Sequence, residues 1–284
     1  MPRRGLFRSL GASGLRSVAW GVAGLLLTVF FVAWSFPYER LAAAISTAVA
    51  RTTPLSLQIQ ELGPSVSILG PGVRATGVRL SAAGGGELRF DALRLRPAWS
   101  LRWLLLRPTF RLAAELAGGT LDGTLGLAPD FSGEAAELDL AQLPVATFWP
   151  GGALAGRLDA SVDLRASAQG PEGTIALAAR EGSVSLPLLP LPLPFETLTA
   201  RLVLGGDAML RVEALELSGP GLEARVEGSL GQAAAFAQAA CDLRIEIEAE
   251  PALRAGLQSF GVRLGADGRG TLHVTGTPAR PVVE

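Results

Sequence analysis

The side chains that most often carry out catalysis are rare in this sequence. His273 is the only histidine, so a metal centre that needs several histidine ligands cannot form. Cys241 is the only cysteine, which excludes an internal disulfide and a zinc site built from thiolates. We predict that His273 faces solvent from the middle of a strand, and that Cys241 is buried as a small apolar residue.

Acidic side chains are plentiful, but their spacing does not indicate a catalytic pair. Asp159 and Asp163 are four residues apart and Glu246 and Glu248 two apart, so each pair shares one face of a strand. Acids on the outer face of a strand are usually solvated. The turn Gly84-Gly85-Gly86 lacks the lysine that follows a phosphate-binding loop, and no GxSxG motif occurs. The sequence predicts no enzyme, no cofactor and no metal.

The composition limits the class of partner. The 284 residues carry a formal net charge of −1, and all 25 basic residues are arginine, a bias typical of GC-rich coding. No basic stripe is present to neutralise a phosphate backbone, so nucleic acid is not a predicted partner. The hydrophobic fraction is 49% but the aromatic fraction only 6%, so alanine, leucine and glycine dominate the apolar positions.

The longest apolar segment is residues 18–36 (VAWGVAGLLLTVFFVAWSF), which contains no charged side chain. As a helix it would cross the roughly 30 Å hydrocarbon core of a bilayer, so the sequence predicts a transmembrane helix. Four arginines precede it and aromatic residues flank it, which orients residues 1–17 to the cytoplasm and the rest to the periplasm. A cleaved signal peptide is the alternative. The predicted anchor residues are Val18, Trp20, Leu25, Phe30, Trp34 and Phe36.

Residues 37–53 are predicted to form a juxtamembrane helix. Leu41, Ile45 and Val49 recur every four residues, which gives residues 38–50 one apolar stripe. After Pro54 the period of the apolar residues changes to two, the pattern of half-buried strands. The sequence therefore predicts a single β-rich periplasmic domain over residues 54–284, after an inner-membrane anchor that crosses once.

About a dozen short strands, separated by glycine and proline turns, are predicted in this domain. Leu55, Leu57 and Ile59, and later Leu158, Val162 and Leu164, fall on one face of their strands. That face is either the core of the domain or an open groove. Gly63-Pro64 and Gly70-Pro71-Gly72 are predicted turns, Gly77 a strand irregularity, and residues 173–179 and 181–186 two separate strands.

Three short helices that begin at proline are predicted, over residues 97–106, 144–148 and 251–260. Residues 186–194 (LPLLPLPLP) are predicted to be an extended connector, because four prolines remove backbone donors. Residues 270–276 are the last predicted strand, followed by a tail. The predicted fold is mainly β: a long, twisted antiparallel sheet with one apolar face and a few short covering helices.

Several segments together resemble a known family. They are the arginine-flanked apolar segment running into Phe36-Pro37-Tyr38, Leu62-Gly63-Pro64, Leu69-Gly70-Pro71-Gly72, and the end Val274-Thr275-Gly276-Thr277-Pro278. They resemble the type II secretion system protein N (GspN) family. The wider pattern, including DLAQLP at residues 139–144 and the Gly-Thr-Pro-x-x-Pro end, is similar to AsmA-like and TamB-like proteins, which are usually much longer.

Two functions follow as hypotheses. The resemblance implies a non-enzymatic, inner-membrane-anchored component of the type II protein secretion system, with other secretion components as partners. The alternative is an AsmA-like protein that binds or transfers lipids, with acyl chains on the apolar face of the sheet. A third reading is a periplasmic adaptor unrelated to secretion.

Overall fold

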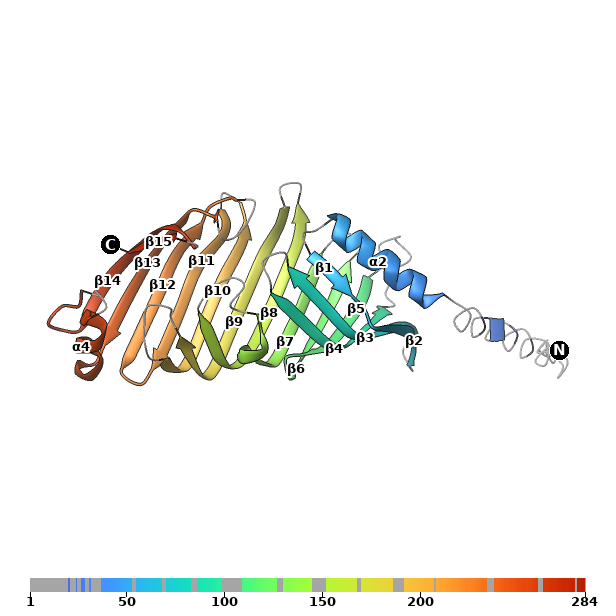
Figure 1. Ribbon diagram of the computed structural model, residues 1–284, viewed down its shortest axis with the longest axis horizontal. Coiled ribbons are helices and arrows are strands. Elements are labelled where there is room, and N and C mark those ends of the chain that lie inside the picture. The colour runs from blue at the N-terminus through green and yellow to red at the C-terminus, as the bar shows by residue number, and fades with distance from the viewer. Residues whose placement is uncertain are drawn as a thin grey trace, which may run out of the picture.

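The computed structural model forms one large antiparallel sheet of fifteen strands (Figure 1). The predictions of a mainly β chain and of a single long antiparallel sheet are confirmed. The structure describes residues 20, 24, 27–28, 31, 37–52, 55–67, 70–82, 86–98, 109–126, 130–144, 152–167, 170–185, 192–206, 208–233, 238–259, 263–278 and 280–283.

The described chain begins with helix α2 (Tyr38–Thr52), which lies along β1 and β2. A 3-10 turn, η2 (Leu140–Gln142), and helix α4 (Pro251–Ser259) lie between later strands. The strands are β1 (Leu55–Gln58), β2 (Glu61–Ser67), β3 (Gly70–Ala82), β4 (Glu87–Pro97), β5 (Thr109–Leu116), β6 (Gly119–Gly126), β7 (Phe131–Asp139), β8 (Ala153–Ser167), β9 (Gly170–Ser185), β10 (Leu193–Gly205), β11 (Ala208–Gly219), β12 (Leu222–Leu230), β13 (Cys241–Ala249), β14 (Arg269–Thr277) and β15 (Arg280–Val283).

From β3 to β15, each strand pairs with the next strand along the chain. At the other end, β1 and β2 both pair with β3: β2 with residues 70–76 and β1 with residues 79–82. Gly77 lies between these two stretches and has a φ of 59°, which confirms the predicted irregularity. β1 and β15 do not pair with each other, so the sheet is open.

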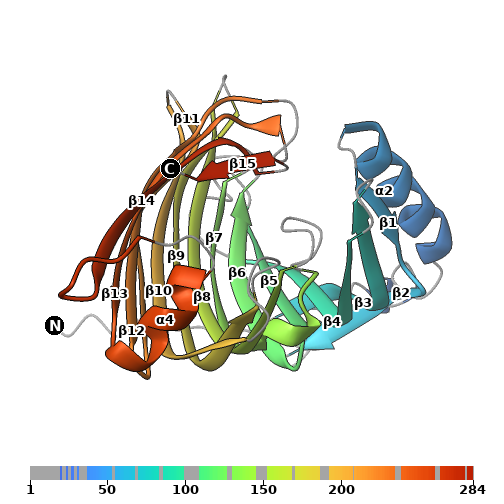
Figure 2. The same ribbon diagram turned by 60° about the vertical axis from the view of Figure 1, so that its left-hand side comes forward.

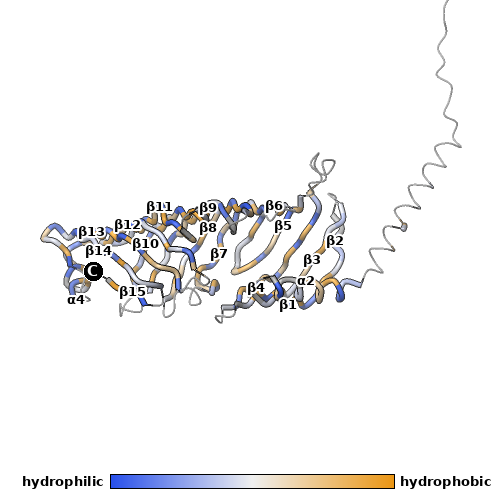
Figure 3. Tube along the Cα trace, turned by 90° about the horizontal axis from the view of Figure 1, so that it is seen from above, coloured by the Kyte–Doolittle hydropathy of each residue, from blue (hydrophilic) through white to orange (hydrophobic). Residues whose placement is uncertain are grey.

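The sheet is strongly curved (Figure 2). Strands β7 to β14 form one wall, and β1 to β3 stand across from them beside α2. Turned by 90°, the sheet extends along the long axis of the molecule, with β2 and α2 toward one end and β14 and α4 at the other (Figure 3). Position along the sheet follows position in the chain from β3 onward, because each strand pairs with the next.

The predicted transmembrane segment lies mostly outside the described residues. Trp20, Gly24, Leu27, Thr28 and Phe31 are described, and all five are helical. No helix formed by the residues described here has both the length and the hydropathy needed to cross a bilayer. The helical pattern predicted over residues 38–50 is confirmed, since α2 covers these residues and extends to Thr52.

Several predicted strand boundaries were wrong. Gly63-Pro64 lies inside β2, and Gly70-Pro71-Gly72 begins β3, so the turn between these strands falls between the two motifs. The two strands predicted before residue 186 are one long strand, β9, in which Glu181 has a φ of 51°. The predicted tail contains a further strand, β15. A left-handed residue or a proline at an edge interrupts the alternation without ending the strand.

The predicted short helices have mixed outcomes. α4 confirms the helix that begins at Pro251. Pro97 is the last residue of β4, and the rest of that predicted helix lies outside the described residues. The helix predicted over residues 144–148 also falls mostly outside the described residues, and η2 lies just before it. The connector at residues 186–194 is described only from Pro192 onward, and its end was wrong, because β10 begins at Leu193.

Buried side chains form two clusters near the short helical elements, and the larger one extends to Ala114 and Ala135 inside β5 and β7. The larger cluster includes Leu138, Leu140, Leu158 and Phe195, and the smaller one joins Leu222, Ala249 and Leu257 of α4. No large side chain in the described ranges is less than 2% exposed. The molecule is therefore a single sheet with buried margins rather than two packed layers.

Candidate functional site: the apolar face of the sheet

One row of apolar residues crosses thirteen strands without interruption. We call it the apolar row. Each member lies directly opposite the next across a pair of antiparallel strands, so all of the side chains point to the same face. From β2 to β14 the members are Leu62, Ala75, Leu93, Ala114, Leu121, Ala135, Ala160, Leu177, Ala200, Leu215, Val226, Ile245 and Leu272.

The apolar row is long because the spacing between strands is fixed. Neighbouring strands lie about 4.8 Å apart, so the row extends for roughly 58 Å, nearly twice the ~30 Å hydrocarbon core of a bilayer. Colouring the chain by hydropathy shows apolar and polar residues alternating along the strands (Figure 3). This alternation repeats from strand to strand, which makes one face of the sheet apolar over nearly its whole length.

Burial along the apolar row depends on side-chain size. The small residues Ala75, Ala114, Ala135 and Ala200 are buried, whereas Leu177, Leu215, Ile245 and the other large members are only half-buried. Large side chains beneath a second layer would be buried, since interiors are close-packed. Within the ranges that the structure describes, η2 packs on β8, α2 on β1 and β2, and α4 on the ends of β12 and β13, so helices cover the sheet only locally. Leu93, Leu121 and Leu177 pack against the larger buried cluster, and all the large members of the apolar row stay partly accessible.

The predicted apolar-face residues of β8 alternate along the strand and so lie on one side of it. Leu158 is opposite Ala179, Val162 opposite Ile175, and Leu164 opposite Gly173. Leu158 is 9% exposed and belongs to the larger buried cluster, whereas Val162 and Leu164 are half-buried. Two further apolar rows run through these positions: Leu158, Ala179, Leu198, Leu217, Ala224 and Ile247, and Val162, Ile175, Leu202 and Val212.

The predicted residues of the first strand are only partly brought together. Leu57 of β1 lies opposite Leu80 of β3 and is half-buried. Leu55 lies opposite Ala82, but its side chain is outside what the structure describes. Ile59 was predicted to continue the strand, and it lies beyond its end, because β1 stops at Gln58.

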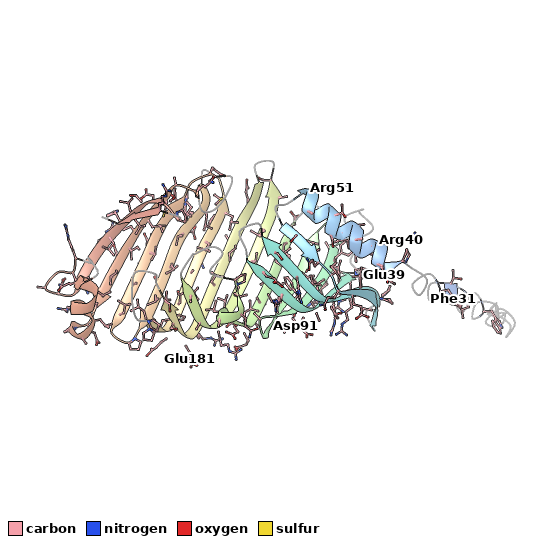
Figure 4. All side chains as sticks on the ribbon, in the orientation of Figure 1. Phe31, Glu39, Arg40, Arg51, Asp91 and Glu181 are labelled. Atoms are coloured by element: carbon pink, nitrogen blue, oxygen red, sulfur yellow. The ribbon has the colours of Figure 1, made fainter. Side chains whose placement is uncertain are left out.

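Of the predicted anchor residues, only Trp20 is described, and it is 78% exposed. Val18, Leu25, Phe30, Trp34 and Phe36 lie outside the described residues. Phe31, the described aromatic residue nearest to α2, is also exposed, and Figure 4 shows it away from the sheet.

The opposite face is polar and crossed by ion pairs. Arg225 contacts Glu216 and Glu227, Arg244 contacts Glu246, and Arg269 contacts Glu248. A surface depression of about 860 Å³ lies on this face across β10 to β14. Its charged lining consists largely of these mutually paired side chains. It is thus an ion-paired surface and offers no nucleophile beside a base.

Asp159, which shares a face of β8 with Asp163, stabilises a strand irregularity. Glu137 has a φ of 57°, and its backbone N–H donates to Asp159 Oδ1 at 3.0 Å. This hydrogen bond, supported by the Arg180 guanidinium, lowers the pKa of the Asp159 carboxyl. Asp163 is exposed and contacts Arg165 at 3.9 Å. Both carboxylates thus have structural partners.

The other residues that could act in catalysis or bind a metal, His273 and Cys241, are not grouped into a site. His273 is exposed on β14, as predicted. Cys241 is buried, also as predicted, and burial raises the pKa of its thiol. In the portion of the chain with a described structure, no three histidine, cysteine, aspartate or glutamate side chains are grouped to hold a metal ion.

The edge of the sheet at β14 is partly unpaired. β15 covers only Val274–Thr277, while the Arg269 carbonyl accepts a hydrogen bond from Gly265 N–H at 2.7 Å. Because backbone groups alternate in direction along a strand, those of Thr271 and His273 point the same way as the Arg269 carbonyl. No described strand pairs with Thr271 or His273 on that side.

Sequence reasoning assigned no member of the apolar row to the apolar face. The residues it named lie on or next to β1 and on β8, outside the row, and it named none of the members such as Leu215, Ile245 and Leu272. Their alternation with polar residues is visible in the sequence. Their alignment across strands is not, because it depends on registers set by bulges at Ala135/Leu138 and Val212/Leu215.

Comparisons with protein-family models, curated proteins and solved structures find no match to this chain.

Proposed function

We propose that this protein is a non-enzymatic cell-envelope protein whose apolar sheet face binds the acyl chains of lipids. The observation that carries the proposal is the apolar row, with its large side chains half-buried along thirteen strands. Exposed apolar surfaces of this extent on soluble domains usually mark an interaction site.

The energetics suit a lipid that comes from a membrane. Covering an apolar CH₂ group contributes about 0.8 kcal/mol relative to water. An acyl chain that leaves a bilayer exchanges one apolar environment for another, so its own transfer is nearly neutral. What drives binding is the simultaneous covering of side chains such as Leu177, Leu215 and Ile245. A face of this kind can accept and release acyl chains without a catalytic step.

Photo-crosslinking tests the proposal with matched positions. A photoreactive phenylalanine analogue replaces either Leu215 or its neighbour Glu216, which points to the opposite face. The full chain is purified with its native lipids, irradiated and examined by mass spectrometry. We expect lipid adducts at Leu215 and none at Glu216. Absence of adducts at Leu215, together with no lipid in the extract of the purified chain, would identify this face as an ordinary core and overturn the proposal.

A second candidate function is the accessory secretion component that the family resemblance implies. The specific observation in its favour is the partly unpaired edge of β14 at Thr271 and His273, since an extended strand from a partner can add to such an edge. Deletion of the gene should then reduce release of secreted enzymes, and the protein should co-purify with secretion components. Normal secretion without such partners would argue against this role.

A further inference from the structure

Four arginines form a cluster on the polar face of β3, β4 and β5. Arg74 lies directly opposite Arg94, and Arg96 directly opposite Arg111. Arg94 and Arg96 are two residues apart on β4, so all four side chains point to the same face. With strands about 4.8 Å apart and alternate residues about 6.8 Å apart, the arginine cluster occupies an area of roughly 10 by 7 Å.

The arginine cluster lacks the acids that neutralise similar pairs elsewhere in the sheet. Arg79 also lies opposite Arg89, but Glu87 contacts both guanidinium groups. Arg157 lies opposite Arg180, and Arg180 contacts Glu137 and Asp159. Like charges directly opposite each other destabilise a sheet, so the acids beside these two pairs have a clear structural role.

In the arginine cluster only Arg94 has an acidic contact, with Glu115 at 3.7 Å. Arg74, Arg96 and Arg111 make no ion pair or hydrogen bond through their side chains with the described part of the chain. Asp122 lines the same depression as Arg111 but lies beyond ion-pair distance. Three guanidinium groups thus remain available to an external anion.

Basic and acidic residues are also distributed unevenly along the chain, with the excess of basic residues on the side of the arginine cluster. From α2 to β5 the described residues include eight arginines and five acidic residues, whereas residues 117–284 contain eleven arginines and twenty-one acidic residues. Because the strands follow one another in space in sequence order, this division makes one end of the sheet basic and the other acidic. Arg40 and Arg51 of α2 belong to the basic end (Figure 4).

We propose that the arginine cluster binds the phosphates of anionic phospholipids at a bilayer surface and so sets the direction of the sheet relative to that bilayer. Guanidinium groups bind phosphate through paired hydrogen bonds. A bilayer fits better than nucleic acid, because the acidic end would repel a long polyanion, while a planar surface can contact the basic end alone. The predicted anchor precedes this same end. Contact through the polar face leaves the apolar row of these strands uncovered.

The test uses the full chain in lipid nanodiscs and a fluorescent label near the arginine cluster. In a C241A background, Thr124→Cys places the label opposite Arg111, and Ser218→Cys places it on the same face in the acidic part. Lipids with a spin-labelled headgroup quench a label that contacts the surface. We expect quenching at position 124 to be roughly twofold stronger in discs with phosphatidylglycerol than in pure phosphatidylcholine, and to fall with salt. The label at position 218 should not respond.

Matched variants separate this contact from a loss of folding. R74Q/R96Q/R111Q should abolish the difference in quenching at position 124 between the two kinds of nanodisc. Thermal unfolding should show that this variant remains folded, because the substitutions remove repulsion between arginines. R201Q/R263Q/R280Q removes three exposed arginines that also lack a described partner, from the acidic part, and should keep the difference. Equal quenching in both discs, or equal effects of the two triple variants, would overturn the proposal. So would displacement of the label response by inorganic phosphate alone, which would indicate a site for a small anion. None of these outcomes depends on whether lipid crosslinks at Leu215, so this proposal and the proposed lipid binding can fail separately.

Discussion

Arg96 of β4 lies directly opposite Arg111 of β5, and neither guanidinium has an acidic partner among the residues that the structure describes. Replacing Arg96 with glutamate turns this repulsive pair into an attractive one. We expect R96E to raise the melting temperature by up to about 3 °C, from a gain of roughly 0.2–1 kcal/mol. The variant R79E loses the contact with Glu87, and its melting temperature should therefore be lower than that of the natural protein. A melting temperature of R96E at or below that of the natural protein would contradict this expectation.

Gly77 should resist substitution more than Gly63. The φ of Gly77 is 59°, and an added Cβ would meet the side chain of Gln60. An L-residue in this conformation costs about 1–2 kcal/mol, so G77A should destabilise the protein by at least that amount. At Gly63 an added Cβ meets nothing within 4 Å. Thermal unfolding of G77A and G63A should therefore differ by several degrees, and equal melting temperatures would show that β3 tolerates an alanine at position 77.

The loss of stability on replacing Phe195 and Leu215 with alanine should distinguish a buried cluster from an accessible face. Phe195 is 3% exposed in the larger buried cluster, and F195A should cost about 3–5 kcal/mol. Leu215 is half-buried, so L215A should cost well under half as much. Denaturant unfolding measures both values. A loss at Leu215 as large as that at Phe195 would mean that the apolar row is a closed core.

Acid should weaken the hydrogen bond between Asp159 and the Glu137 backbone. The pKa of Asp159 is lowered in the folded chain, so the ionised carboxylate stabilises the fold above about pH 4, the ordinary range of aspartate. This contribution is lost as the pH falls through the lowered pKa. The melting temperature of D159N should therefore change less than that of the natural protein between pH 7 and pH 3. The neighbouring variant S161A should follow the natural protein.

Cys241 should react with alkylating reagents only when the sheet opens. Its thiol is buried between β12 and β14 partners, and its raised pKa lowers the fraction of reactive thiolate. Alkylation in native buffer should be slow and should accelerate at the denaturant concentration at which unfolding begins. Rapid labelling of the folded protein would show that this end of the sheet opens locally.

The fold class could be predicted because it depends on local patterns. The change to a period of two after Pro54 indicated a β-rich domain, and Pro251 marked the start of α4. Boundaries failed where the interruption is conformational, as at Glu181, since a single left-handed residue lets β9 continue. The apolar row could not be predicted as a continuous feature, because each register depends on pairing between segments. The arginine cluster is likewise visible only once β3, β4 and β5 are aligned.

The sequential order of the strands also affects how the length of this protein can change. Each strand from β4 to β14 pairs only with the strand before it and the strand after it. Inserting or deleting one hairpin would thus lengthen or shorten the sheet by about 10 Å without disturbing more distant strands. Duplication of a hairpin in the gene would preserve the alternation of apolar and polar residues. Evolution can therefore adjust the reach of such a molecule in discrete steps of two strands.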